Sequence, residues 1–296
     1  MREGLPEAWL VWTLFGLVAL AVFVTYSRLP RRELYHVSGS GIAGGAGRAL
    51  VFLGFPSALG AIAVLVVIAD RLEGRLARAL GVTALLACAS VAWPGVFDER
   101  DLDASWAKVP AAEGTLLVFM LTFTAARVRR ERDPPPSRRG DLARAAVVAV
   151  VLLVGLPYMA SDLGFFLDGV PVLGSIFITG THPHHSVLPA VHHGHHHGMD
   201  GMLLATTALL LGRTLGAVRR RLRPVVAAYL SLLFVYGATN LANDLWDEQI
   251  FKRGWTDWLI PNVIRPSVSA AWGAMLLAAA LLYALALGPR PLLARR

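Results

Sequence analysis

Cysteine and charge are both scarce in this chain, and each scarcity excludes a class of protein. The single cysteine, Cys88, lies in an apolar run, so the chain has no disulfide framework and no cysteine-based metal site. Only 16% of the residues are charged and 55% are hydrophobic, whereas soluble globular proteins have about 25% and about 45–50%. This balance excludes a disordered chain and a collagen-like fibre.

Apolar sequence is what the chain has in abundance. Crossing a bilayer as a helix takes roughly 20 predominantly apolar residues. Eight stretches reach or approach this length, namely residues 8–27, 49–69, 76–96, 111–128, 142–161, 199–218, 225–246 and 266–287. We therefore predict an all-α, polytopic integral membrane bundle of about eight transmembrane helices. Residues 1–296 form one membrane domain in this interpretation, because no intervening segment is large enough to fold alone.

The distribution of basic residues predicts the orientation. With the N-terminus placed inside, 19 of the 28 basic residues but only 7 of the 20 acidic residues fall on the inner side. This follows the positive-inside rule, so both termini are expected to be cytoplasmic, in a cell membrane that is most simply a bacterial cytoplasmic membrane. The net charge of +8 is thus mainly an orientation signal. It points to the lipid bilayer as the partner and gives no support for nucleic acid.

Two connecting segments organise the chain between the predicted spans. A basic, proline-rich inner loop around residues 129–141 separates two four-helix halves. A histidine-rich outer segment, residues 162–198, is itself apolar enough to pack against the bundle.

Eight of the nine histidines crowd into the outer segment just before the sixth span: His182, His184, His185, His192, His193, His195, His196 and His197. If a helix begins near Pro189, then His192, His196 and Asp200 are spaced at i, i+4 and i+8 on one face. His193 and His197 form a second i, i+4 pair.

Imidazole is the commonest protein metal ligand, so this spacing predicts a transition metal site for Zn, Fe or Cu. The predicted ligands are His182, His184, His185, His192, His193, His196, His197 and Asp200. The alternative is a loose histidine tract that buffers metal without a fixed site. Gly194, Gly198 and Gly201 are interleaved with the histidines and favour close helix packing there.

A polar stripe runs along the end of the seventh span. Asn240, Asn243, Asp244, Asp247 and Glu248 follow a helical spacing. Charged groups inside a membrane segment are costly and face the bundle interior or a wet cavity. We therefore predict that Asp244, Asn243 and Asn240 are catalytic. The alternative, which weighs equally for Asp247 and Glu248, is an ordinary helix end that emerges into water.

The first outer loop carries arginines against the charge rule. Arg28 and Arg32 are predicted to bind an anionic substrate such as a lipid phosphate through charge-assisted hydrogen bonds. Salt bridges to the outer carboxylates are the alternative. The segment 37–47 that follows contains six glycines and is expected to be a flexible loop.

These patterns lead to three functional hypotheses. The first is a metal-dependent enzyme that acts at the outer leaflet on a lipid or other anionic membrane substrate. The second is a divalent-metal transporter or a metal-delivery and assembly factor, with the histidine segment as its outer capture site. The third is a structural or partner subunit that binds metal only incidentally. The sequence leaves the oligomeric state open.

Overall fold

The computed structural model describes residues 5–34, 37–97, 102–128, 140–178, 191 and 197–287. All regular elements in these residues are helices. The main ones are α1 (Pro6–Arg28), α2 (Gly41–Gly54), α3 (Pro56–Ile68), α4 (Gly74–Ala89), α5 (Val109–Arg127), α6 (Asp141–Asp162), α7 (Gly174–Phe177), α8 (His197–Gly212), α9 (Arg223–Trp246) and α10 (Ala270–Leu282). Short 3-10 or π segments are η1 (Arg31–Glu33), η2 (Ala69–Arg71), η3 (Ser90–Ala92), η4 (Trp106–Lys108), η5 (Arg213–Gly216), η6 (Asp247–Phe251) and η7 (Tyr283–Leu287).

The helices have the length and composition of a membrane protein. Six of them, counted with their short extensions, are long and apolar enough to cross a bilayer: Pro6–Arg28, Gly41–Arg71, Gly74–Ala92, Trp106–Arg127, Asp141–Asp162 and Arg223–Phe251. Large apolar side chains such as Leu86, Leu153 and Leu277 point outward, with 62–73% of their surface exposed. Outward-facing leucines of this kind suit a lipid environment.

The predicted count of eight spans is thus met only in part. All eight predicted stretches fall on helices, but residues 199–218 and 266–287 form shorter ones, α8 and α10. Neighbouring helices enclose α8 almost completely, so most of its residues are buried. A helix enclosed by protein is not bound to match the thickness of the bilayer, which explains how α8 can be short.

Prolines fix several helix boundaries. Pro6, Pro56, Pro110 and Pro224 lie in the first turns of α1, α3, α5 and α9, where the missing N–H costs nothing. Pro56 also disfavours helical dihedral angles at Phe55, whose φ of −119° and ψ of −83° separate α2 from α3. The predicted span 49–69 is therefore two helices in sequence.

The glycine-rich segment 37–47 is not the flexible loop that the composition suggested. Residues from Gly41 onward form the first turns of α2. Gly45 lies directly against Ser27 and the carbonyl of Phe23 in α1, and a Cβ there would collide with both. The glycines thus allow two helix backbones to approach closely, as small residues do in membrane bundles.

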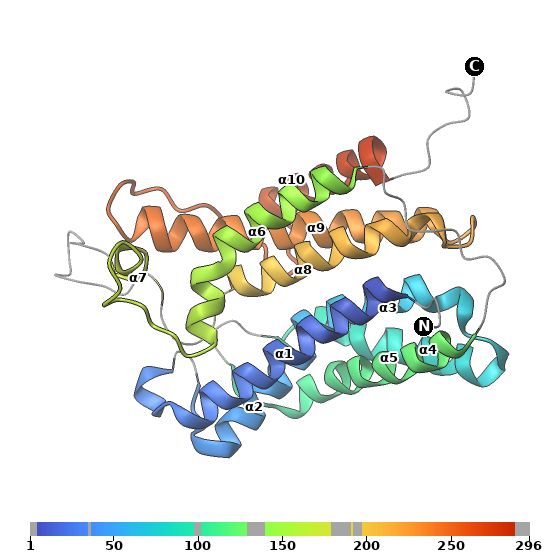
Figure 1. Cartoon of the computed structure of the whole chain (residues 1–296), viewed down its shortest axis with the longest axis horizontal. Coiled ribbons are helices and arrows are strands. Elements are labelled where there is room, and N and C mark those ends of the chain that lie inside the picture. The colour runs from blue at the N-terminus through green and yellow to red at the C-terminus, as the bar shows by residue number, and fades with distance from the viewer. Residues whose placement is uncertain are drawn as a thin grey trace.

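Figure 1 shows α1 to α5 together on one side of the bundle and α6, α8, α9 and α10 on the other. The most extensive contact joins α8 and α9, where Gly201 and Gly237 face each other with no room for a Cβ on either. The predicted close packing at Gly198 and Gly201 is confirmed, and Gly194 lies outside the described residues.

The long axis of the bundle has two distinct ends (Figure 1). We call the one beside α7 the α7 end; the C-terminal end of α1 and the start of α8 also lie there. The start of α1, the end of α10 and the residues on either side of segment 129–139 lie at the opposite end. The segment before α8 packs against the bundle as expected, because Phe177 and Val191 are buried.

Candidate functional site

The histidine segment is described only at its last residue. His182, His184, His185, His192, His193 and His196, all predicted metal ligands, lie outside the described residues. The predicted helix start near Pro189 is wrong, because α8 begins at His197 and Val191 lies in a bend. The N–H of Val191 instead donates to the carbonyl of Phe177, at 3.3 Å. This bond and the burial of Val191 hold the chain against α7 and away from a helical path.

His197 lies beside Asp244, which brings a predicted ligand and a predicted catalytic residue together. Nε2 of His197 is 3.7 Å from Oδ1 of Asp244, too long for a hydrogen bond. The Asp244 side chain is only 4% exposed, and that of His197 is 18% exposed. The two residues come from different helices, so the α8–α9 packing creates this contact.

Asp244 also stabilises the start of α8. Its Oδ2 accepts a hydrogen bond of 2.8 Å from the N–H of Gly198. A carboxylate at this position satisfies one of the free N–H groups of the first turn and complements the helix dipole. Gly198 is packed tightly, because a Cβ on it would lie 2.6 Å from Oδ2 of Asp244 and 2.8 Å from the ring of Tyr158 in α6.

Asp200, the last predicted ligand, belongs to a second buried cluster. It interacts electrostatically with Arg48 of α2, and so does Asp162 at the end of α6. The guanidinium of Arg48 lies 5.5 Å from the ring centroid of Tyr26 in α1. All four residues are buried. This cluster, which we call the Arg48 cluster, joins four helices through charged and aromatic groups inside the bundle.

The polar stripe of α9 holds the chain that follows it. Nδ2 of Asn243 donates to the carbonyl of Ile260 at 2.9 Å, and Trp246 Nε1 donates to the carbonyl of Trp258 at 2.8 Å. The Tyr236 hydroxyl donates to the carbonyl of Ile264 at 2.8 Å. Three side chains thus satisfy carbonyls of a non-helical segment. Non-helical backbone at membrane depth needs such partners.

The remaining stripe residues separate by depth. Asn240 is buried one turn from Tyr236 and is a hydrogen-bond partner of its side chain. Asn243 is buried too, and its Oδ1 has no hydrogen-bond partner among the described residues. Glu248 forms an ion pair with Lys252. The inner part of the stripe therefore faces the interior, while Glu248 is already paired with a basic residue beyond the helix.

The predicted substrate-binding arginines lie on the surface of the α7 end. Arg28 and Arg32 are both exposed, and Arg32 belongs to η1. The guanidinium of Arg28 lies near Gly164, just after α6. The buried arginine of this region is Arg48 instead, which the sequence placed merely at the opening of the second span.

Sequence reasoning missed the residues that complete both buried sites. Tyr26, Arg48, Tyr158 and Asp162 were not among the predicted site residues, yet each contacts or interacts with one of them. Arg48 and Asp162 carried a usable signal, because each is a charged residue at the edge of an apolar stretch. The two tyrosines carried none.

Chemically, the α7 end combines acceptors with one imidazole. Among the described ranges, no three histidine, cysteine, aspartate or glutamate side chains are grouped closely enough to hold a metal ion. The His197–Asp244 contact supplies two potential ligands, and any third ligand must come from elsewhere. Comparison of the chain with protein-family models, with curated proteins and with solved structures finds no match.

Proposed function

We propose that this membrane protein is a metal-dependent enzyme that acts at the outer leaflet on a lipid or other anionic membrane substrate. The observation that carries the proposal is the contact between His197 and Asp244 at the α7 end. These residues bring an imidazole nitrogen and a carboxylate oxygen together in a mostly buried place. The chain that directly precedes His197 contains seven further histidines.

The distance between these two atoms suits ligands of one ion. Two ligand atoms that share a transition metal ion lie within about 4.2 Å, twice the usual metal–ligand distance of about 2.1 Å. The 3.7 Å between Nε2 and Oδ1 is inside this limit. We expect the other ligands to come from the predicted set His182, His184, His185, His192, His193 and His196. Zn, Fe and Cu all suit this ligand chemistry, which lowers the pKa of bound water or activates oxygen.

The other predicted residues have defined tasks in this proposal. Asp244 positions the start of α8 and presents a carboxylate, while Asn240 and Asn243 provide polar groups one turn deeper. The unpartnered Oδ1 of Asn243 is an acceptor for a substrate hydroxyl or for water. Arg28 and Arg32 are exposed at the same end and suit an anionic head group.

The Arg48 cluster favours an enzyme over the alternative of a divalent-metal transporter. A transported cation has to continue from the α7 end into the interior, where the buried guanidinium of Arg48 lies beside Asp162 and Asp200. A fixed positive charge there repels a divalent cation. The metal-delivery factor and the structural subunit become outcomes of the tests below.

We further propose that the protein resides in a bacterial cytoplasmic membrane with the α7 end outside. Support comes from the arginines at the opposite end, including Arg71, Arg213 and Arg219, which fit the positive-inside rule. A Ser137→Cys variant should resist membrane-impermeant thiol reagents in intact cells and react after lysis. Labelling from outside contradicts this orientation.

Metal content is the direct test of the proposed function. Purified wild-type protein should hold stoichiometric Zn, Fe or Cu by elemental analysis, and His197→Gln should lose most of it because one ligand is gone. Asp168→Asn, a carboxylate change at the same end away from His197, is the matched control and should retain the ion. A metal-free wild-type protein, or a content that His197→Gln leaves unchanged, contradicts the proposed site.

Two further measurements separate the enzyme from its alternatives. Metal-loaded protein incubated with extracted anionic lipids should consume one of them, as seen by mass spectrometry, and chelation should stop this loss. Sustained uptake of the metal into proteoliposomes contradicts the enzyme and supports the transporter. Metal binding with neither conversion nor flux contradicts the enzyme as well and leaves a delivery or structural role.

A further inference from the structure

A mostly apolar cavity lies between the two sides of the bundle, away from the histidine segment. Its volume is about 410 Å³, toward the lower end of the roughly 300–1,000 Å³ typical of ligand sites. The α2–α3 junction, residues 91–97, one face of α9, residues 264–266 and Trp272 of α10 line it. Helices from both sides thus contribute, which is where bundles commonly bind small molecules.

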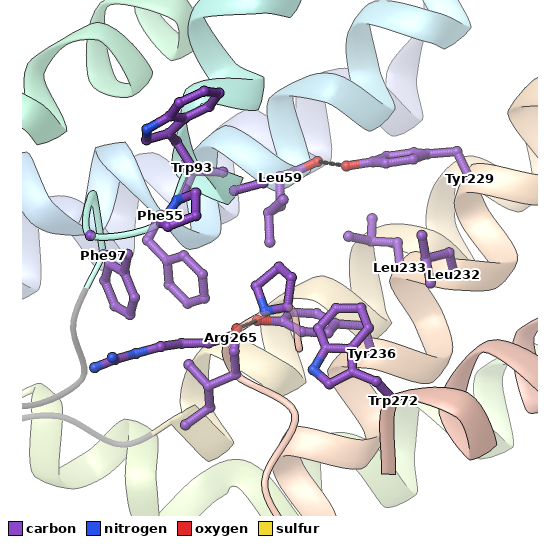
Figure 2. A pocket seen from close by; sticks show the side chains of 16 residues that line it. Phe55, Leu59, Trp93, Phe97, Tyr229, Leu232, Leu233, Tyr236, Arg265 and Trp272 are labelled. Carbon is purple, nitrogen blue, oxygen red and sulfur yellow. Dashed lines mark hydrogen bonds between the residues drawn. The ribbon is translucent and has the colours of Figure 1, made fainter. Parts of the chain in front are cut away.

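Aromatic rings form two facing walls of this cavity. Figure 2 shows Phe55 and Phe97 on one side and Tyr236 and Trp272 on the other. Phe55 and Phe97 stack at 4.0 Å between centroids, and Tyr236 and Trp272 lie 6.2 Å apart. Rigid rings of this kind bury an apolar ligand at little cost in side-chain entropy.

Two hydrogen bonds fix the cavity walls. The Tyr229 hydroxyl of α9 donates to the carbonyl of Leu59 in α3 at 2.8 Å, drawn as a dashed line in Figure 2. The Tyr236 hydroxyl is held by the carbonyl of Ile264. Both hydroxyls therefore spend their donors on backbone, so the walls between them present mainly carbon to a ligand.

The charge at the cavity sits on one residue. Among the described residues that line it, Arg265 alone is charged. Its side chain is exposed and extends past Phe97 in Figure 2. Trp93, also in the lining, is 73% exposed, and exposed tryptophan is typical of the membrane–water interface. The cavity is thus apolar within and cationic at an edge where lipid head groups lie.

We propose that this cavity binds a single-chain membrane amphiphile, with its apolar chain between the aromatic walls and its anionic head beside Arg265. The modest volume favours one chain over two. This proposal goes beyond the metal chemistry proposed above and does not depend on it, because neither His197 nor Asp244 lines the cavity.

Photolabelling tests the proposal without any substitution. Wild-type protein in lipid nanodiscs is irradiated with a diazirine-bearing myristic acid, and the labelled peptides are identified by mass spectrometry. Labels should concentrate on the cavity lining, around residues 55–59, 93–97 and 232–236, and excess unlabelled myristic acid should suppress them. Labelling spread evenly over the lipid-facing residues of α6 and α10, without competition, overturns the proposal.

Variants test the two parts of the ligand separately. Leu233→Trp fills the cavity and should reduce its labelling several-fold, and Leu232→Trp repeats the test if the first variant is unstable. Leu277→Trp, on the exposed face of α10, is the matched control and should label as wild type. Unchanged labelling in a folded cavity-filling variant overturns the site.

Arg265→Gln tests the anionic head. It should weaken competition by myristic acid roughly tenfold, as expected for the loss of one charge-assisted hydrogen bond. Competition by the uncharged methyl ester should be weak in wild type and unaffected by the substitution. Equal competition by acid and ester overturns the assignment of an anionic head.

Discussion

The two ends of the bundle hold their charges in different ways. At the opposite end, carboxylates pair with arginines near the surface: Arg213 lies 3.3 Å from Glu7 and 3.2 Å from Asp141, and Arg144 lies 3.1 Å from Asp141. At the α7 end, Asp162, Asp200 and Asp244 are almost wholly buried. Their partners include Arg48 and the N–H of Gly198.

This difference separates charges that orient the protein from charges that can serve its function. An exposed ion pair contributes about 0–1 kcal/mol to stability, so most of the arginines at the opposite end can be exchanged at little cost. A buried charge is costly unless it is compensated, and it is kept inside a membrane bundle mainly where it has a task. The α7 end is therefore the functional end in our interpretation.

Removal of Arg48 should give the largest difference between the ends. Arg48→Ala leaves the buried carboxylates of Asp162 and Asp200 without their cation, which should cost about 3–5 kcal/mol of unfolding free energy. Arg144→Ala at the opposite end should cost about 0–1 kcal/mol. Unfolding of the purified protein in a denaturing detergent series measures both. Equal losses in the two variants contradict the contrast between the ends.

Gly198 offers a second and smaller test of the same contrast. Gly198→Ala places a methyl group against Asp244 and Tyr158 and should destabilise the protein by about 1–3 kcal/mol, as overpacking does. Gly216→Ala in η5, at the other end of the α8 region, meets nothing within 4 Å and should leave stability unchanged or slightly raised. A thermal melt of both variants decides the point, and a neutral Gly198→Ala argues against the tight packing around Asp244.

Local patterns in the sequence were enough for the helices but not for the site. The eight apolar stretches all lie on helices, and the spacing of Gly198 and Gly201 correctly indicated close packing, because periodicity and residue size act over a few turns. The Arg48 cluster joins residues from four helices spread along the chain. No local pattern could pair Arg48 with Asp162 and Asp200, since only the folded bundle brings them together.

The polar stripe of α9 shows the same limit within a single helix. Its spacing correctly indicated that Asn240, Asn243 and Asp244 face the interior. Two of their bonds, from Asn243 to Ile260 and from Gly198 to Asp244, involve backbone that the sequence could not place. The start of α8 was misplaced for a related reason, because a tertiary bond at Val191 decides where the helix begins.

Asp103 is the case that separates burial from position. It lies in the α4–α5 connection and is only partly buried, and the N–H of Ser38 donates to its Oδ1 at 3.0 Å. Partial burial raises the pKa of the Asp103 carboxyl, but hydrogen bonds from Ser38 and Gly39 and the charge of Lys108 outweigh it, so the net pKa is below its ordinary value. A lowered pKa in the folded state means that the ionised form is the one that folding stabilises.

The stability that Asp103 contributes should therefore be present above its ordinary pKa of about 3.9 and be lost as the pH falls through the lowered value. Asp103→Asn should lower the melting temperature slightly at pH 7, and the gap to wild type should close below about pH 4. Since the group is near solvent, we expect the smallest effect of the three, comparable to Arg144→Ala. A loss as large as that of Arg48→Ala would mean that position at the α7 end, and not burial, sets the energetic weight of a charge.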